Sequence, residues 1–94
     1  EARLLECLKD DSWEVRGEAV RSLGKIHAGA AIKMLEERLS DPSWWVRMNA
    51  AMAIRRMGPA GDRVLLGLSV SGDARLRDMA GYALAVSPAS IESD

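Results

Sequence analysis

The residues best suited to catalysis are one histidine, His27, and one cysteine, Cys7. Nucleophilic catalysis by a cysteine needs a base beside it, and acid–base catalysis by a histidine needs a positioned partner. His27 falls at the end of a predicted helix, where a histidine more often contacts backbone carbonyls. Cys7 lies among leucines, as expected of a cysteine that packs in a core. The sequence therefore predicts a protein that is not an enzyme.

Metal and phosphate sites are also missing from the pattern. No two His or Cys residues have the spacing of metal ligands. Gly58 and Gly61 flank a turn and do not join a strand to a helix, as the glycines of a phosphate-binding loop do. We expect no cofactor and no metal.

Arginines with a regular spacing are the third candidate for chemistry. Arg47 lies 31 positions after Arg16, and Arg77 lies 30 positions after Arg47. Asp10 and Asp41 precede the first two arginines by six positions each. A guanidinium group binds carboxylates and phosphates through paired hydrogen bonds, so one hypothesis is that these arginines bind an anionic ligand.

The same spacing organises the elements that carry these arginines. Ser12, Ser43 and Asp73 stand where a helix N-cap belongs, because each can accept a hydrogen bond from a free amide of the first turn. After each cap, apolar residues recur at helical spacing. The three stripes are Val15, Ala19, Leu23 and Ile26; Val46, Ala50, Ala53, Ile54 and Met57; and Leu76, Ala80, Ala83 and Leu84. A fixed step of this size predicts a repeat array, with close helix contacts at the alanines.

Each copy is predicted to be a helix, a short turn and a second helix. The expected helices are 3–9 and 13–26, 30–39 and a helix ending near Met57, then 63–70 and a last helix after Asp73. Asp62 is the predicted cap of helix 63–70, after a break at 58–61. No segment has the pattern of a β-strand, so we expect an all-α chain of about six helices in three antiparallel pairs.

The middle copy reads Asp41, Val46, Arg47, Ala50 and Ile54, and it resembles a HEAT repeat in the short bacterial form of about thirty residues. The first copy is a close variant, and the third departs at Ser71 and Leu76. The resemblance implies a right-handed α-solenoid with repeats at about 1–27, 30–58 and 61–87, forming one domain over 1–94 with a polar tail at 88–94. It also implies that the aspartates and arginines form a structural ladder between neighbouring copies. Both interpretations of the arginines stay open.

Comparing the copies predicts different burial for the three tryptophans. Trp13 and Trp44 are equivalent, which predicts that both are buried. Trp45 is equivalent to Glu14 and Arg75, and a position that holds charged residues in sister copies is predicted to be exposed.

The same comparison predicts a binding surface on the second helices, which line the concave side in HEAT arrays. Exposed aromatic residues, methionines and arginines are enriched in protein interfaces. The candidate partner-binding residues are Trp45, Met48, Met52, Arg55, Arg56, Arg21, Lys25 and Tyr82. The alternative is that Trp45 covers a missing neighbour or a subunit contact.

Composition and charge limit the kinds of partner and the cellular compartment that can be expected. The chain has 94 residues and a formal charge of −1, which disfavours nonspecific attraction to phosphate backbones. No apolar run is long enough to span a bilayer, so a membrane anchor is expected only outside this sequence. The start at Glu1 indicates a fragment whose apolar N-terminal face, around Leu5, could self-associate. A lone cysteine and a looser likeness to modules of bacterial membrane-anchored proteins suggest a bacterial, cytoplasmic or cytoplasm-facing protein.

Two functions are therefore weighed. The first is a non-catalytic protein-binding scaffold module with an unknown protein partner. The second is nucleic-acid binding, as in HEAT-like DNA-alkylation repair proteins, through Arg21, Lys25, Arg47, Arg55 and Arg56 with Trp45 for stacking. The balanced net charge favours the first.

Overall fold

The structure is a computed structural model that describes residues 6–25 and 31–86. Its elements are α2 (Trp13–Lys25), α3 (Ile32–Glu37), the 3-10 helix η2 (Arg38–Ser40), α4 (Trp44–Arg56), α5 (Pro59–Leu68) and α6 (Ala74–Ala85). Within the described ranges there is no strand, so the predicted all-α class is confirmed. Residues 3–5 of the predicted helix 3–9 lie outside the described residues; of its described part, Glu6 and Cys7 are helical and Leu8 and Lys9 form a turn.

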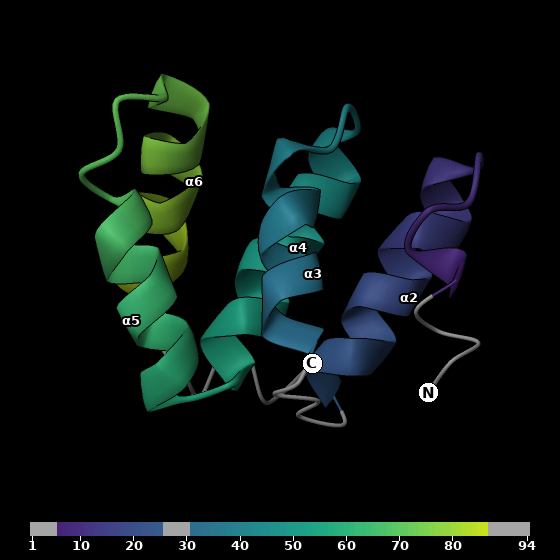
Figure 1. Cartoon of the computed structure of the whole chain (residues 1–94), viewed down its shortest axis with the longest axis horizontal. Coiled ribbons are helices and arrows are strands. Elements are labelled where there is room, and N and C mark those ends of the chain that lie inside the picture. Colours follow the sequence, from purple (N-terminus) through teal and green to yellow (C-terminus); the bar gives the residue numbers. More distant parts are fainter. Residues whose placement is uncertain (1–5, 26–30, 87–94) are drawn as a thin grey trace.

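The helices form neighbouring pairs, with α4 in the middle of the stack (Figure 1). α3 packs on α4 to form one pair, and α5 packs on α6 to form the next. α4 also contacts α2 on one side and α6 on the other, so the second helices of the three copies lie in a row. This order along the row is the α-solenoid that the repeat pattern predicts.

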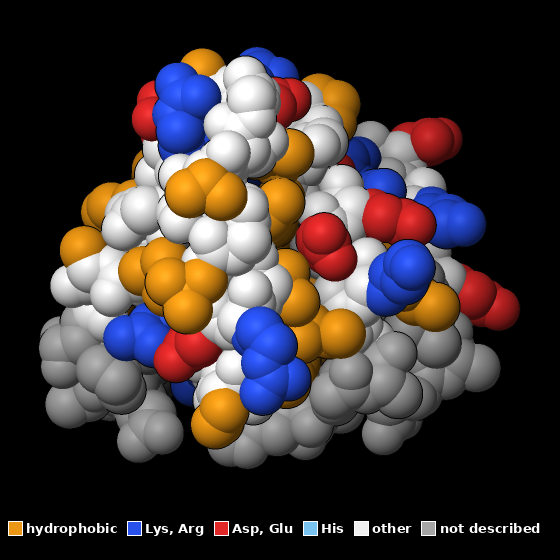
Figure 2. Space-filling model, turned by 60° about the vertical axis from the view of Figure 1, so that its left-hand side comes forward, with side chains coloured by type: hydrophobic (Ala, Val, Ile, Leu, Met, Phe, Trp, Pro, Cys, Tyr) orange, Lys and Arg blue, Asp and Glu red, His pale blue; other side chains and the backbone are white. Residues whose placement is uncertain are grey.

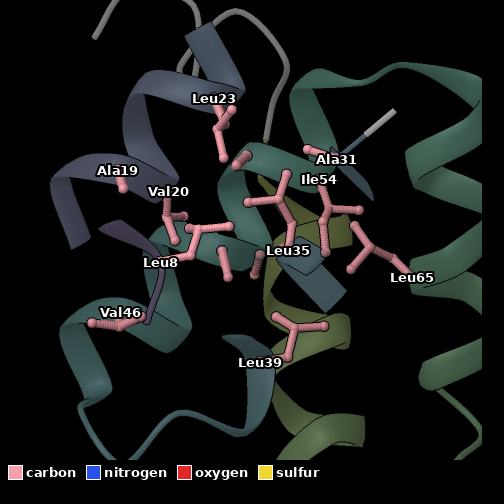
Figure 3. Packing of buried hydrophobic residues seen from close by; sticks show 14 of the residues in the cluster. Leu8, Ala19, Val20, Leu23, Ala31, Leu35, Leu39, Val46, Ile54 and Leu65 are labelled. Atoms are coloured by element: carbon pink, nitrogen blue, oxygen red, sulfur yellow. The ribbon is translucent and has the colours of Figure 1, made fainter. Parts of the chain in front are cut away.

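One hydrophobic core runs through all three copies (Figure 3). Leu23 of α2, Leu35 of α3, Ile54 of α4 and Leu65 of α5 are fully buried within it. The stripe of α4 is confirmed, since its residues from Val46 to Ile54 are buried. Val15 is exposed, contrary to the prediction, and it borders a shallow hollow on α2 with Glu14 and Glu18.

The predicted N-caps differ in how they act. Asp73 caps α6 directly, because its Oδ1 accepts hydrogen bonds from the amides of Arg75 and Leu76 at 2.9 and 3.3 Å. Ser43 is the N-cap residue of α4 but makes no side-chain capping bond. Ser12 instead donates its hydroxyl to Glu14 at 2.7 Å, which lowers the pKa of Glu14. Capping by the Ser43 and Ser12 side chains was therefore wrongly predicted.

The break after α4 is shorter than the sequence suggested. Gly58 takes a φ of 75°, a left-handed conformation that favours glycine, and α5 begins at the next residue. Pro59 is suited to the first helical position because its fixed φ is helical and its missing amide has no partner there. The predicted start at residue 63 was therefore too late, and Asp62 lies inside the helix, not at its cap.

Candidate functional site

The first and second copies are joined by a two-pronged ion pair. Arg16 of α2 donates to the carboxylate of Asp41, from Nε to Oδ2 at 2.8 Å and from Nη2 to Oδ1 at 3.0 Å. Arg38 adds a second link, because its Nη1 donates to the carbonyl of Leu8 at 3.0 Å and lies 3.6 Å from Asp41 Oδ2. Between these copies, the ladder implied by the family resemblance is present.

Asp41 remains charged although it is buried. Burial by itself raises the pKa of this carboxyl group. Hydrogen bonds from Arg16 and from the amide of Ser43, together with the charges of Arg16 and Arg38, outweigh that effect and hold the pKa of Asp41 below its ordinary value. The hydrogen bonds between Arg16 and Asp41 raise the pKa of Arg16. The pair is therefore fully ionised near neutral pH.

All three repeat arginines brace the turn that precedes their own helix. Arg16 Nη1 donates to the carbonyls of Asp10 and Asp11, at 2.7 and 3.1 Å. Arg47 Nη1 donates to the carbonyls of Asp41 and Pro42, at 2.8 and 3.0 Å. Arg77 Nη1 donates to the carbonyl of Ser71 at 3.0 Å. This shared role explains why the arginine recurs at one place in each copy.

The carboxylate link is not repeated between the second and third copies. Ser71 occupies the place that Asp41 holds in the copy before it. The hydroxyl of Ser71 accepts from the amide of Asp73 at 3.0 Å, as the carboxylate of Asp41 accepts from Ser43 at 2.9 Å. Ser71 therefore keeps the turn but supplies no carboxylate. Across the described residues, Nε and Nη2 of Arg47 have no protein partner, and neither nitrogen is fully buried.

Two glycines allow α2 to lie close against α4. A β-carbon on Gly17 would lie 2.5 Å from Nε1 of Trp45, and one on Gly24 would lie 2.7 Å from Cβ of Ala53. A side chain at Gly24 would meet the backbone of Ala53 and force the helices apart, and one at Gly17 would displace the indole ring of Trp45. In α4, the equivalent positions hold Met48 and Arg55. α4 therefore offers α6 no glycines of the kind that let α2 and α4 lie close together.

A groove of about 320 Å³ lies between α4 and α6. We call it the α4–α6 groove, and its lining residues are Trp44, Arg47, Met48, Arg75, Asp78, Met79 and Tyr82. Its volume is at the lower end of the range for ligand sites, and it suits a few side chains of a partner. Trp44 and Tyr82 are 59% and 57% exposed, so its rim is aromatic and accessible.

The predicted burial of Trp13 and Trp44 is wrong, whereas Trp45 is exposed as predicted. Trp44 is 59% exposed and Trp13 is 46% exposed, whereas Trp45 is the most buried of the three at 37%. The cause is Gly17, because its missing side chain leaves room for the indole ring of Trp45. Equivalent positions in other copies do not report burial here, since each faces a different neighbouring helix. The comparison between copies therefore predicted the wrong order of burial for Trp44 and Trp45.

The remaining predicted surface residues are scattered. Met48 and Tyr82 come together in the α4–α6 groove, whereas Trp45 borders a separate hollow with Trp13, Glu14 and Glu18. Met52 is half-buried against the core. Arg55 is turned toward the third copy, where it pairs with Asp62 at 2.7 Å and donates to the carbonyl of Val86 at 3.2 Å. Arg21 and Arg56 are half-buried and have interactions within the protein, and Lys25 is exposed at the end of α2.

Four residues of the groove were absent from the predicted partner-binding set: Trp44, Arg75, Asp78 and Met79. A fifth, Arg47, was considered for binding an anionic ligand and for the nucleic-acid alternative, but was not in that set. The replacement of Gly17 by Met48 and of Asp41 by Ser71 was the signal in the sequence that could have located the groove.

Outside the groove, exposed hydrophobic side chains also occur on the side that carries α5. That side comes forward in Figure 2, where hydrophobic side chains form a broken band with charged side chains around it. Leu66 and Val70 of α5 are exposed large hydrophobic residues.

Other kinds of site find no support in the described part of the chain. Residues 6–25 and 31–86 contain no group of three or more His, Cys, Asp or Glu side chains able to hold a metal ion. Within the same ranges, no helix has the length and apolar character needed to cross a membrane. The apolar face predicted around Leu5 lies outside the described residues.

Comparison with known proteins gives one family. A family model described as HEAT repeats matches residues 1–85, nearly the whole chain. The comparison with curated proteins gave no match.

Proposed function

The chain belongs to the HEAT repeat family, and on that premise we propose that it is a non-catalytic scaffold module that binds a protein partner in the α4–α6 groove. HEAT repeats commonly serve as scaffolds for protein interactions. In such arrays each copy contacts only its neighbours, which leaves extended surfaces open for partners.

The observation that carries the proposal is that the α4–α6 groove combines exposed aromatic side chains with methionines and arginines. Trp44 and Tyr82 leave more than half of their surface to solvent, and Met48 and Met79 line the same groove. Tryptophan, tyrosine and arginine are the residues that most often dominate binding energy at interfaces. Burying them against a partner would remove an apolar surface that the fold itself does not cover.

Nucleic-acid binding has less support. Of the five cations considered for it, Arg55 pairs with Asp62, and Arg47 uses one of its nitrogens to brace its own turn. Arg21 and Arg56 also have interactions within the protein. These residues do not present a row of free cations along which a phosphate backbone would lie.

Affinity capture with paired variants tests the proposal. The chain, the Trp44→Ala variant and the Leu66→Ala variant are immobilised, and proteins retained from an extract of the source cells are identified by mass spectrometry. Leu66 is the matched control, because it is as exposed as Trp44 at 59% but lies on α5, outside the groove. We expect a protein retained by the chain and by Leu66→Ala and lost with Trp44→Ala. Equal retention by all three would contradict a partner site in the groove.

A titration with labelled duplex and single-stranded DNA separates the two functions. At ~50 mM salt, where electrostatic binding to phosphates is strong, we expect no binding. Binding that weakens steeply as salt rises, and that requires Arg47 and Arg75, would favour the nucleic-acid function instead.

A further inference from the structure

The link between the first and second copies uses a carboxylate that is missing between the second and third copies. Arg16 uses Nη1 on the carbonyls of its own turn and its Nε and Nη2 edge on the carboxylate of Asp41. Arg47 makes the same Nη1 contacts with its own turn. Its Nε and Nη2 edge lacks a carboxylate in the described residues, because Ser71 stands in place of the aspartate.

Arg47, whose Nε and Nη2 edge we call its open edge, is one of the residues that line the α4–α6 groove. Arg47 borders the α4–α6 groove together with Arg75, which also has no ion pair with any described residue. Asp78 is the single acidic group in the lining. Two guanidinium groups and one carboxylate leave a single positive charge, which complements a monoanion better than a doubly charged phosphate.

The apolar part of the groove adds a second requirement. Trp44 and Tyr82 present exposed aromatic rings, and Met48 and Met79 are flexible side chains that adapt to different apolar groups. A ligand that satisfies both features carries a carboxylate and an apolar side chain within a short distance of each other. A peptide segment with an acidic residue next to an aromatic or aliphatic residue has this chemistry.

We propose that the α4–α6 groove binds an acidic, apolar segment of a partner protein, whose aspartate or glutamate side chain occupies the open edge of Arg47. The carboxylate takes the place that Asp41 holds against Arg16. The neighbouring apolar side chain of the partner packs against Trp44 and Tyr82. This inference rests on the proposed function and specifies the chemistry of its partner.

Two peptide display libraries provide the test. Both hold short peptides with a fixed aromatic or leucine residue and blocked termini, and they differ at one neighbouring position. One library has Asp or Glu there, and the other has Asn or Gln. Selected peptides are then made with a fluorescent label, and their affinity for the chain is measured by anisotropy at about 0.15 M salt. A third set carries its only carboxylate at a free C-terminus, and a fourth carries a phosphoserine.

Three variants and one control locate the carboxylate. Arg47→Gln removes the open edge but also the bonds to the turn, so its folding is checked by urea denaturation. Ser71→Asp keeps the turn and supplies an internal carboxylate to Arg47, so it competes with the partner without removing any groove side chain. Trp44→Ala reports whether a peptide binds in the groove at all. Arg77→Gln is the matched control, because Arg77 has the equivalent place and the equivalent bond to its turn but does not line the groove.

The proposal expects peptides from the acidic library to bind and to lose at least about tenfold in affinity on replacement of Asp by Asn or Glu by Gln. Arg47→Gln and Ser71→Asp should each weaken the same peptides, and Arg77→Gln should not. Peptides from the amide library that bind equally well and depend on Trp44 alone would overturn this inference and leave the proposed function standing. A requirement for the free C-terminus or for phosphoserine would overturn the choice of a side-chain carboxylate. No Trp44-dependent binder from any set would overturn both.

Discussion

Gly24 of α2 and Ala53 of α4 lie so close that a β-carbon on Gly24 would be 2.7 Å from Cβ and 2.8 Å from Cα of Ala53. Contacts this short between helices are possible only where one residue lacks a side chain. Gly17, seven residues earlier on the same helix, accommodates the indole ring of Trp45 in the same way. The first two copies therefore pack closely because Gly17 and Gly24 have no side chains, and the Arg16–Asp41 ion pair also links them.

Replacing Gly24 with alanine is expected to lower the free energy of unfolding by about 1–3 kcal/mol, the cost of inserting a methyl group into a packed contact. The clash involves the backbone of Ala53, so no side-chain rotation relieves it. Urea denaturation followed by circular dichroism measures the change. Gly81→Ala is the matched control, because Gly81 also lies inside a helix but has open space around it. That variant should gain about 0.5–1 kcal/mol from helix propensity, and a similar gain for Gly24→Ala would refute the packing account.

The two adjacent tryptophans of α4 are expected to differ in their effect on stability. Trp45→Ala removes the ring that packs on Gly17 and should cost about 2 kcal/mol, less than the 3–5 of a fully buried aromatic residue. Trp44→Ala removes a ring that is 59% exposed and should change the stability by only about 0.5 kcal/mol. Thermal and urea unfolding of the two variants give the comparison. A larger cost for Trp44 would mean that the groove is covered in the free protein.

The repeat step and the apolar stripes were sufficient to predict the class, the stacking and most of the core, because residues such as Val46, Ala50 and Ile54 face the interior in any helical array. The surface was predicted less well. Its character depends on distances between neighbouring helices, which are set by Gly17, Gly24 and the residues opposite them. Trp13 and Trp44 were wrongly predicted to be buried. The contact of Trp45 was missed because it is made with Gly17 of the preceding copy and does not follow from the position of Trp45 in its own repeat. Comparing what each copy presents to its neighbour would have paired Trp45 with Gly17 and indicated the groove.

Acid should weaken the link between the first two copies. The folded chain holds the pKa of Asp41 below 3.8, the ordinary value for an aspartate. The pair therefore contributes its full stability above that value. As the pH falls below it, the unfolded chain binds a proton before the folded chain does, and the stability from this pair is lost as the pH passes through the lowered pKa.

The variant Asp41→Asn tests this pH dependence. Near pH 7 it should be less stable than the original chain by about 2 kcal/mol, because hydrogen bonds to charged groups contribute about 1.5–3 kcal/mol. The difference should shrink as the pH is lowered below 3.8, measured by urea unfolding at a series of pH values. A difference that stays constant with pH would show that the charge of Asp41 does not contribute to the stability.

Ser71→Asp should build the missing link between the second and third copies. The new carboxylate would keep the bond to the amide of Asp73, as Asp41 bonds to the amide of Ser43, and would present its other oxygen to Arg47. We expect the free energy of unfolding to rise by about 1 kcal/mol, the net value of a hydrogen-bonded pair at a partly exposed site. Ser71→Asn is the neutral control of similar size, and it should give little of this gain.

A double-mutant cycle with Arg47→Gln isolates the pair from other effects of the new charge. Asp73 lies two residues away, and its carboxylate would repel that of a new aspartate. If the gain comes from Arg47, Ser71→Asp should no longer stabilise the chain when Arg47 is replaced, and the coupling energy should be about 1 kcal/mol. The coupling should also weaken in high salt, as expected of a partly exposed ion pair. A gain that persists without Arg47 would place the stabilisation in the turn itself, and the open edge of Arg47 would then not be the position of a missing carboxylate.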